Sequence, residues 1–311
     1  MRRLRAIGVA VGVILASTVT FAQDDPVFPG GDRQHDAIRA VLRQLVPRRV
    51  RSVGTSSVTF RLEMGDTDGS YKPRTRTHPR GYLAEIAAYR ISRMLGMDNL
   101  PPVVWRTFPT WIFQERWEGE RADWEPYRNE ILWDGPNTAR GALIYWIPRM
   151  SRTDLDSAAG IQRWSTWLAV GAEIPAGSEA LARDLSNMVV FDYLIANWDR
   201  FSGGNVSVDE SGTRLYIRDH NGSFATLNDL RHGRLREELT RTQRFSRRTI
   251  ERLVALDDER LRAGLLVGPD GDEPLLDDRQ VADVLARKAT ILSYVGALIT
   301  LHGEARVLSL D

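Results

Sequence analysis

The 311-residue sequence contains no cysteine. This absence excludes disulfide bonds, a lipidated cysteine, thiol catalysis and cysteine-ligated zinc. Its five histidines show no zinc-binding spacing, and no GxSxG segment supports serine hydrolysis. Packing must therefore stabilise the chain, and the candidate chemistry rests on carboxylate, amide and amine side chains.

An excess of charge of one sign is also absent. The 42 lysines and arginines balance 41 acidic residues, which gives a formal net charge of +1. Such a chain has no overall electrostatic reason to bind nucleic acid or an anionic membrane. Glutamates interrupt an arginine-rich stretch between residues 231 and 252, and we interpret this stretch as a solvated helical face.

The N-terminus has the pattern of a secretory signal peptide. Three arginines precede an uncharged run that ends at Ala22, after Thr20 and Phe21. The run is shorter than the roughly 20 apolar residues of a spanning helix. We therefore expect a signal peptide over residues 1–22, a flexible leader over 23–33 and an exported protein, periplasmic or secreted. The alternative is that the segment remains as an N-terminal membrane anchor.

The first half of the remaining chain predicts a small sheet with helices. Apolar and polar residues alternate from Val58 to Met64, which predicts a half-buried strand, and a Gly/Asp turn leads to a returning strand that carries Lys72. Apolar residues at helical spacing predict helices over 34–45 and 81–96. The tryptophan-rich stretch 105–150 is expected to be irregular except for a buried strand near 142–147.

The second half predicts mainly helices. A strong helix covers 179–197, two short strands cover 206–208 and 215–217, and helices follow from residue 227, including a long one over 281–301. Strands with helices first and helices later favour an α+β protein with segregated lobes. We place the lobes at 34–145 and 146–311.

The densest set of chemical groups flanks the predicted hairpin of the second half. Asp199 and Asn205 precede it, and Asp219 follows it. Oxygen ligands of this kind suit Mg²⁺ or Mn²⁺. Phosphoryl transfer needs such a set together with a lysine that grips the nucleotide and a glutamate that orients the lysine. Lys72 and Glu85 stand upstream in that order.

The chain order therefore matches that of protein kinases. In this interpretation Asp199 is the catalytic base, Asp219 and Asn205 are metal ligands, and Lys72 with Glu85 binds the nucleotide. The expected fold is a two-lobed protein-kinase-like fold, with a small antiparallel-sheet N-lobe carrying one helix and a mainly helical C-lobe. ATP and Mg²⁺ or Mn²⁺ are the expected cofactors.

A family resemblance adds to this interpretation. The helix sequence LAEIAAY, the segment LPPVV and the segments FDYLIANWDR and DHNGSF resemble the secretory-pathway kinases of the FAM20 and Four-jointed group. The resemblance covers roughly residues 50 to 300, more weakly between 105 and 180. It implies an atypical kinase fold, ATP with Mn²⁺ or Mg²⁺, and a protein or sugar hydroxyl as acceptor.

Three features depart from the kinase pattern. Asp199 and Asn205 are six positions apart rather than five, and Phe201 stands where the resembling family often has histidine. No GxGxxG is present. A loop over residues 54–57 is an unspecific candidate for covering the phosphates.

Each candidate residue also has a structural interpretation. Lys72 could be a solvated strand lysine, Asp199 a helix-capping residue and Asp219 a turn residue. Glu85 falls almost opposite the apolar stripe of its helix, so an exposed glutamate is an alternative. His220 is interpreted as a structural loop histidine. The tryptophans, eight of nine of which lie between 105 and 167, fit a core better than a platform for a sugar or peptide.

The sequence thus predicts an exported ATP-dependent kinase with an alcohol acceptor on a protein or glycan. Export removes the enzyme from the cytosolic ATP pool, so ATP must reach it by another route. Two alternatives remain open: a catalytically inactive pseudokinase that acts by contact, and a secreted glycan-binding or glycan-cleaving module built on the tryptophan-rich segment.

Overall fold

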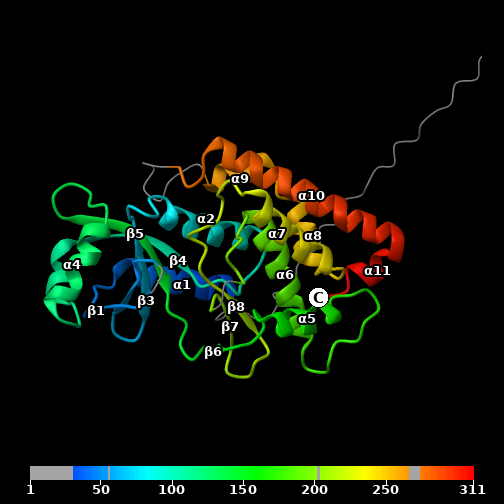
Figure 1. Ribbon diagram of the computed structural model, residues 1–311, viewed down its shortest axis with the longest axis horizontal. Helices are drawn as coiled ribbons and strands as arrows, with labels where there is room; N and C mark the ends of the chain where they lie inside the picture. Colours follow the sequence, from blue (N-terminus) through cyan, green and yellow to red (C-terminus); the bar gives the residue numbers. More distant parts are fainter. Residues whose placement is uncertain (1–30, 55–56, 202–203, 266–273) are drawn as a thin grey trace, which may run out of the picture.

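The computed structural model describes residues 31–54, 57–201, 204–265 and 274–311 (Figure 1). The predicted signal peptide and residues 23–30 of the predicted leader lie outside this part of the chain. The first helix, α1 (Gly31–Gln44), includes the last three residues of the predicted leader.

A five-stranded antiparallel sheet forms the first structural unit. Its strands pair in the order β1, β2, β3, β5, β4, so β3 lies in the middle. The strands are β1 (Arg49–Ser52), β2 (Phe60–Glu63), β3 (Asp68–Pro73), β5 (Thr138–Tyr145) and β4 (Val103–Pro109). The central position of β3 fixes Lys72, because Lys72 is the register partner of Ala142 on β5.

Two small helices and an aromatic cluster cover part of this sheet. The helices are α3 (Thr110–Glu115) and α4 (Arg121–Glu130). Phe113 stacks on Trp124 with ring centroids 5.4 Å apart, and Phe60 lies 5.9 Å from the same tryptophan. These rings belong to one buried cluster that also includes residues of β2 and β5. The tryptophans here act as core.

Helix α2 (Gly81–Met94) connects the sheet to the rest of the molecule. It contacts β3, β4 and β5 on one side and α9 (Asp258–Leu265) on another. Eleven residues of α2 are buried, and its apolar ones join one continuous core with the helices of the second half. Gly96 follows the helix with φ of +70°, a conformation that suits glycine.

The second half is mainly helical, as Figure 1 shows. A small sheet, β6 (Ser151–Arg152), β7 (Val206–Val208) and β8 (Leu215–Ile217), lies beside it. The remaining helices are α5 (Ala158–Trp167), α6 (Glu179–Ile195), α7 (Asp229–Arg241), α8 (Arg247–Val254), α10 (Asp278–His302) and α11 (Glu304–Val307).

Helix α10 is long and apolar enough to cross a bilayer by composition, with a mean hydropathy of 1.4 over its most apolar window. A helix that packs into a core passes the same test. One stripe of α10 is buried at Val281, Val284, Ile291, Val295 and Leu298, and the helix packs against α6. Its opposite side carries mainly small residues such as Ala282 and Ala286.

The predicted elements are largely confirmed, including α2, α6, the hairpin β7–β8 and the long last helix. The expectation of an irregular stretch over 105–150 is wrong, because β4, α3, α4 and β5 occupy most of it. Tertiary packing of the aromatic rings orders this segment, whereas its local sequence has no clear period. The small lobe is also richer in helices than the single one expected.

Candidate active site

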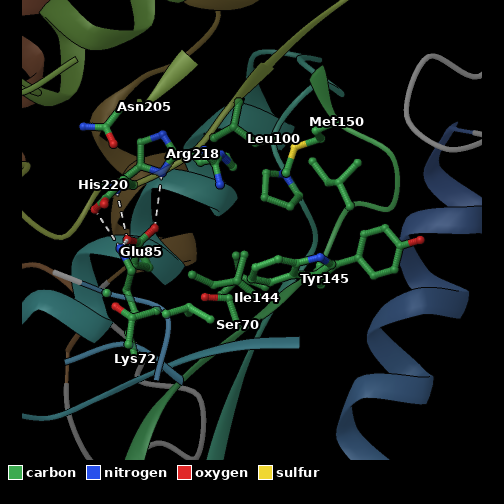
Figure 2. A pocket seen from close by; sticks show the side chains of 18 of the residues that line it. Ser70, Lys72, Glu85, Leu100, Ile144, Tyr145, Met150, Asn205, Arg218 and His220 are labelled. Carbon is green, nitrogen blue, oxygen red and sulfur yellow. Dashed lines mark hydrogen bonds and ion pairs between the residues drawn. The ribbon is translucent and has the colours of Figure 1, made fainter. Parts of the chain in front are cut away.

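Lys72 is the centre of the candidate site. Its Nζ donates hydrogen bonds to Glu85 Oε1 at 2.6 Å and to Asp219 Oδ1 at 2.7 Å. The three residues come from β3, from α2 and from the loop that follows β8, and Figure 2 shows Lys72 and Glu85 among them. The structure therefore brings together three of the five residues predicted from sequence, across 147 positions of the chain.

Burial and charge oppose each other at this cluster. Burial alone would lower the pKa of Lys72, but the charges of Glu85 and Asp219 and their hydrogen bonds raise it above its usual value. Burial would likewise raise the pKa of Glu85, yet Lys72 and His220 hold it well below its usual value. Lys72 and Glu85 therefore remain a charged pair at neutral pH.

The interpretation of Glu85 as an exposed residue is wrong, because only 2% of it is accessible. Helix α2 is buried on nearly all sides, so the side opposite its main apolar stripe faces the site rather than water. A helical wheel cannot predict the burial of Glu85, because it contains no information about the elements that pack against the other side of the helix.

His220 has a more specific role than a general loop histidine. Its backbone N–H donates to Glu85 Oε1 at 2.9 Å, and its Nδ1 lies 3.3 Å from Glu85 Oε2. Since a carboxylate only accepts hydrogen bonds, the contact requires the proton on Nδ1. Together with Lys72, His220 satisfies both oxygens of Glu85 and fixes its orientation.

Asp219 adopts an uncommon backbone conformation, with φ of +62°. Aspartate tolerates this left-handed region better than most residues, but it still carries strain there. Phe224 in the same loop has φ of +61°. The loop between these residues is thus held in a turned shape, and the Asp219 carboxylate bonds to Lys72.

These residues line a cavity of about 440 Å³. Its walls combine the cluster with apolar side chains from both parts of the molecule, which suits a ligand with a flat organic ring and a charged end. Figure 2 shows Leu100, Ile144 and Met150 on the apolar side and Lys72 on the polar side. Gly54 and Ser57 of the predicted covering loop also line the cavity, while residues 55 and 56 lie outside the described residues.

The loop that carries Asp199 begins where α6 ends. Ala196 has φ of +56°, and the backbone N–H of Asn197 donates to Asp192 O at 2.8 Å, which closes the helix. Asn197 is buried, and its side-chain amide donates to Asp219 O at 3.4 Å. Its carbonyl oxygen accepts from the backbone N–H of Asp199 at 3.4 Å. Asn197 thereby links the two loops of the site.

Arg200 is a second link, and it is buried to 1% exposure. Its Nε donates to Asp192 Oδ2 at 2.8 Å and its Nη2 to Asp192 Oδ1 at 2.9 Å. Its Nη1 donates to the carbonyl oxygens of Asn205 and Arg218. One guanidinium therefore ties the end of α6 to the loops before β7 and after β8.

Asn205 and Asp199 lie on the same loop. The side-chain amide of Asn205 donates to Asp199 O at 3.1 Å, and Asn205 lines the cavity beside Asp219. The Asp199 carboxylate is half-buried, and its residue is outside the cavity lining. Asn205 thus contacts the backbone of Asp199 despite the six-residue spacing.

The oxygen donors of Asp219 and Asn205 fit a metal ion whose remaining ligands are phosphate oxygens and water. In the described part of the chain, no three His, Asp or Glu side chains are grouped to hold a metal. Mg²⁺ commonly uses one or two carboxylates and completes its shell with water and substrate phosphates. Asp219 with the amide oxygen of Asn205 supplies oxygen donors of this kind.

Helix α10 supports the site from behind. Gln280 donates to Phe224 O at 3.1 Å, just after the Asp219 loop, and Arg287 donates to Leu194 O at 2.8 Å, just before the Asp199 loop. Gln280 is also part of the capping box that starts the helix with Asp277. Helix α10 is therefore attached to the Asp219 loop and to the last turn of α6, from which the Asp199 loop starts.

By sequence, no protein-family model and no curated protein matches this chain. Solved structures do match. A Golgi casein kinase with Mn and ADP bound aligns with a TM-score of 0.66 at 18% identity, covering 91% of this chain and 80% of that chain. A hydra Fam20 with sugar aligns with a TM-score of 0.65 at 17% identity, covering 89% and 92%. The chain has a FAM20-like kinase fold.

This finding confirms the fold class and the family resemblance inferred from sequence. Sequence reasoning missed two residues of the candidate site, because their roles depend on contacts between distant segments. Arg200 and Asp192 both stand in the segment FDYLIANWDR, but the sequence alone assigns neither of them a role. An aspartate within an otherwise apolar helix, eight positions before an arginine, is the signal that could have indicated a buried pair.

Proposed function

We propose that the chain is an exported ATP-dependent kinase that transfers the γ-phosphate to a hydroxyl group of a protein or glycan. The observation that carries the proposal is the position of Lys72 between Glu85 and Asp219 in the wall of a 440 Å³ cavity. An isolated surface lysine would not be buried between two carboxylates. The kinase-like fold supports the same reaction class.

In this proposal, Lys72 grips the nucleotide phosphates and Glu85 holds it in place. The ammonium has three donors, and two of them bind Glu85 and Asp219 among the described residues. The remaining donor suits a phosphate oxygen. Because Glu85 stays ionised, Lys72 retains its charge when it meets the phosphates.

Asp219 and Asn205 are the proposed metal ligands, and Asp199 is the proposed catalytic base. Asp199 would accept the proton of the acceptor hydroxyl, while Asn197 and Arg200 keep its loop in register with the Asp219 loop. When bound, the metal supplies charge neutralisation on the phosphates and ATP supplies the transferred group. The neighbour that was crystallised with Mn and ADP supports these cofactors.

The class of acceptor is proposed from the same comparison. One neighbour is described as a casein kinase and another as bound to sugar, so protein and glycan hydroxyls both remain candidates. The predicted signal peptide supports export, and a Golgi neighbour is compatible with it. We propose lobes at 34–145 and 146–311, with the cavity between them.

A pseudokinase is the second candidate. The observation that favours it is that the Asp199 carboxylate lies outside the cavity lining. The buried Lys72–Glu85–Asp219 set argues against it, because such a costly charged cluster has a clear use in phosphate binding. The burial of Trp124 and its packing against Phe113 and Trp133 argue against the glycan module, because these rings serve as core.

Two measurements separate these candidates. Thermal melting of the purified protein with ATP and Mn²⁺ should show stabilisation that is lost in Asp219→Asn. Transfer of labelled phosphate should fall at least a hundredfold in Asp199→Ala, because the base is removed while nucleotide binding remains. Nucleotide binding without transfer to any acceptor would indicate the pseudokinase, and no stabilisation in the wild type would overturn the proposal.

A further inference from the structure

A second cavity lies along α2 and shares Tyr89 and Val103 of its lining with the cavity around Lys72. Its volume is about 390 Å³, within the range of small-molecule sites, and α1, α2 and β4 form its walls. Four of its ten lining residues are arginines, and none of the ten is acidic. They are Arg39, Arg43, Arg90 and Arg106.

The arginines repel one another across this cavity. Burial first, and then the charges of Arg39 and Arg43, lower the pKa of Arg90. Burial also lowers the pKa of Arg106. Four guanidinium groups around one hollow cost electrostatic free energy that an anion in the hollow would relieve.

The existing contacts of these arginines use only part of their hydrogen-bonding capacity. Arg106 donates to the carbonyl oxygens of Leu42 and Leu45 and so caps the end of α1. Arg39 forms an ion pair with the exposed Asp36 at 3.1 Å, but its buried Nε has no hydrogen-bond partner among the described residues. A guanidinium offers five N–H donors, so donors remain for a ligand.

The remaining wall of the cavity is aromatic and apolar. Tyr89 lies under the Arg39 guanidinium at 5.7 Å and is bonded to His35 at 3.0 Å, and Trp105 and Val103 complete this wall. Burial raises the pKa of Tyr89 to about 12, so its hydroxyl stays neutral and adds no negative charge. Such a wall suits the carbon skeleton of an organic ligand.

We propose that this arginine pocket binds a small organic molecule with a phosphate or sulfate group, separately from the nucleotide site. Guanidinium forks match the oxygen geometry of tetrahedral anions, and arginines from three elements can contact one anion together. Because Arg39 and Arg43 lie on α1 while Arg90 lies on α2, a bound anion would fasten α1 to the helix that carries Glu85.

Calorimetric titration in the presence of EDTA tests the proposal, because removing metal suppresses binding at the nucleotide site. Pyrophosphate is the main probe at constant ionic strength, and phenyl phosphate and phenyl sulfate distinguish the two classes of anion. We expect Arg39→Gln/Arg43→Gln to weaken pyrophosphate binding at least tenfold. The control Arg234→Gln/Arg236→Gln, two exposed arginines of α7, should keep the wild-type affinity within twofold.

Two further variants keep the test decisive. Asp219→Asn should leave pyrophosphate binding unchanged, because it alters only the nucleotide site. If the double variant melts below the wild type, the single exposed change Arg43→Gln replaces it, with an expected loss of about threefold. Equal affinity in the arginine variants, loss of binding in Asp219→Asn, or no binding of any of the three probes would overturn the proposal.

Discussion

At the scale of single residues, the site depends on charges that are buried together. Glu85 accepts hydrogen bonds from Lys72 and from two atoms of His220, so both of its oxygens are used. Lys72, Glu85 and Asp219 could be predicted from sequence, because each lies on or next to an element that the sequence pattern identifies. The His220 contact could not, because nothing in its neighbourhood indicates a partner 135 positions away.

Glu85→Gln tests the value of this charge. The amide keeps the shape but leaves Lys72 with one carboxylate and gives His220 a poorer acceptor. We expect a loss of about 2–3 kcal/mol in unfolding free energy, and a fall in kcat/KM for ATP of at least tenfold. Urea denaturation and phosphotransfer assays measure the two effects.

The matched control for Glu85→Gln is Glu63→Gln on β2, whose only described ion pair is a 3.9 Å contact with the exposed Arg49. It should change neither quantity measurably. A Glu85→Gln variant with full activity and unchanged ATP affinity would show that Glu85 has no role in nucleotide binding.

Asp98 gives a prediction of pH dependence outside the site. Burial raises the pKa of its carboxyl to about 6, and Arg214 at 3.8 Å only partly opposes this. The folded pKa is above the unfolded value of about 3.9, so the folded state favours the protonated form. The contribution of Asp98 to stability is therefore full below pH 4 and is lost as the pH rises through 6.

Asp98→Asn should therefore stabilise the protein at pH 7.5 by about 1–2 kcal/mol and have little effect near pH 4.5. Urea denaturation of both proteins at the two pH values measures the difference. A variant that is less stable at pH 7.5 would mean that the attraction to Arg214 exceeds the cost of burial.

At the scale of elements, close contact between β3 and β5 sets the position of Lys72. A Cβ at Gly141 on β5 would lie 2.4 Å from Lys72 O and 2.8 Å from Pro73 Cα, both of which are backbone atoms. Only glycine permits this approach. The strand pattern near residue 142 could be predicted from sequence, but the need for glycine could not, because it arises from the neighbouring strand.

Gly141→Ala should therefore separate β3 from β5 and displace Lys72. We expect a loss of about 2–4 kcal/mol in unfolding free energy and a reduced affinity for ATP. Gly233→Ala is the control, because its Cβ would meet nothing within 4 Å in the interior of α7. It should be neutral or stabilise by up to about 1 kcal/mol. Wild-type stability in Gly141→Ala would contradict the strand geometry.

The aromatic segment between β4 and β5 marks the limit of prediction at this scale. Trp124 and Trp133 pack against Phe113, and Trp117 packs against Trp124, through contacts that no local period encodes. The number of tryptophans in this segment predicted a core, but it did not predict the helices α3 and α4 that carry some of these rings. Strong local periodicity predicted α2 and α6, whereas the ordering of this segment comes from tertiary packing.

At the scale of the whole molecule, α2 packs against elements of both halves. It contacts three strands of the five-stranded sheet and also α9, and Arg90 of α2 donates to Gly264 O. The two-lobed architecture was predictable, since strands and helices are segregated along the chain. The packing of α2 against both halves could not be predicted, because the sequence does not show which side of α2 each lobe covers.

We therefore expect the protein to unfold in one cooperative transition rather than lobe by lobe. Differential scanning calorimetry should give equal calorimetric and van't Hoff enthalpies, and ATP with Mn²⁺ should move the single peak to higher temperature. Two separate peaks, with only one of them shifted by nucleotide, would show that the lobes unfold independently.

Helix α10 holds the Asp219 loop through Gln280 and the end of α6 through Arg287, and it therefore fixes the distance between them. Gln280 and Arg287 are seven residues apart, so roughly 10 Å of rigid rise separates the two anchor points. One residue inserted between them would turn one anchor by about 100° away from its loop. The distance between the proposed base and the proposed metal ligand therefore depends on the number of residues between Gln280 and Arg287.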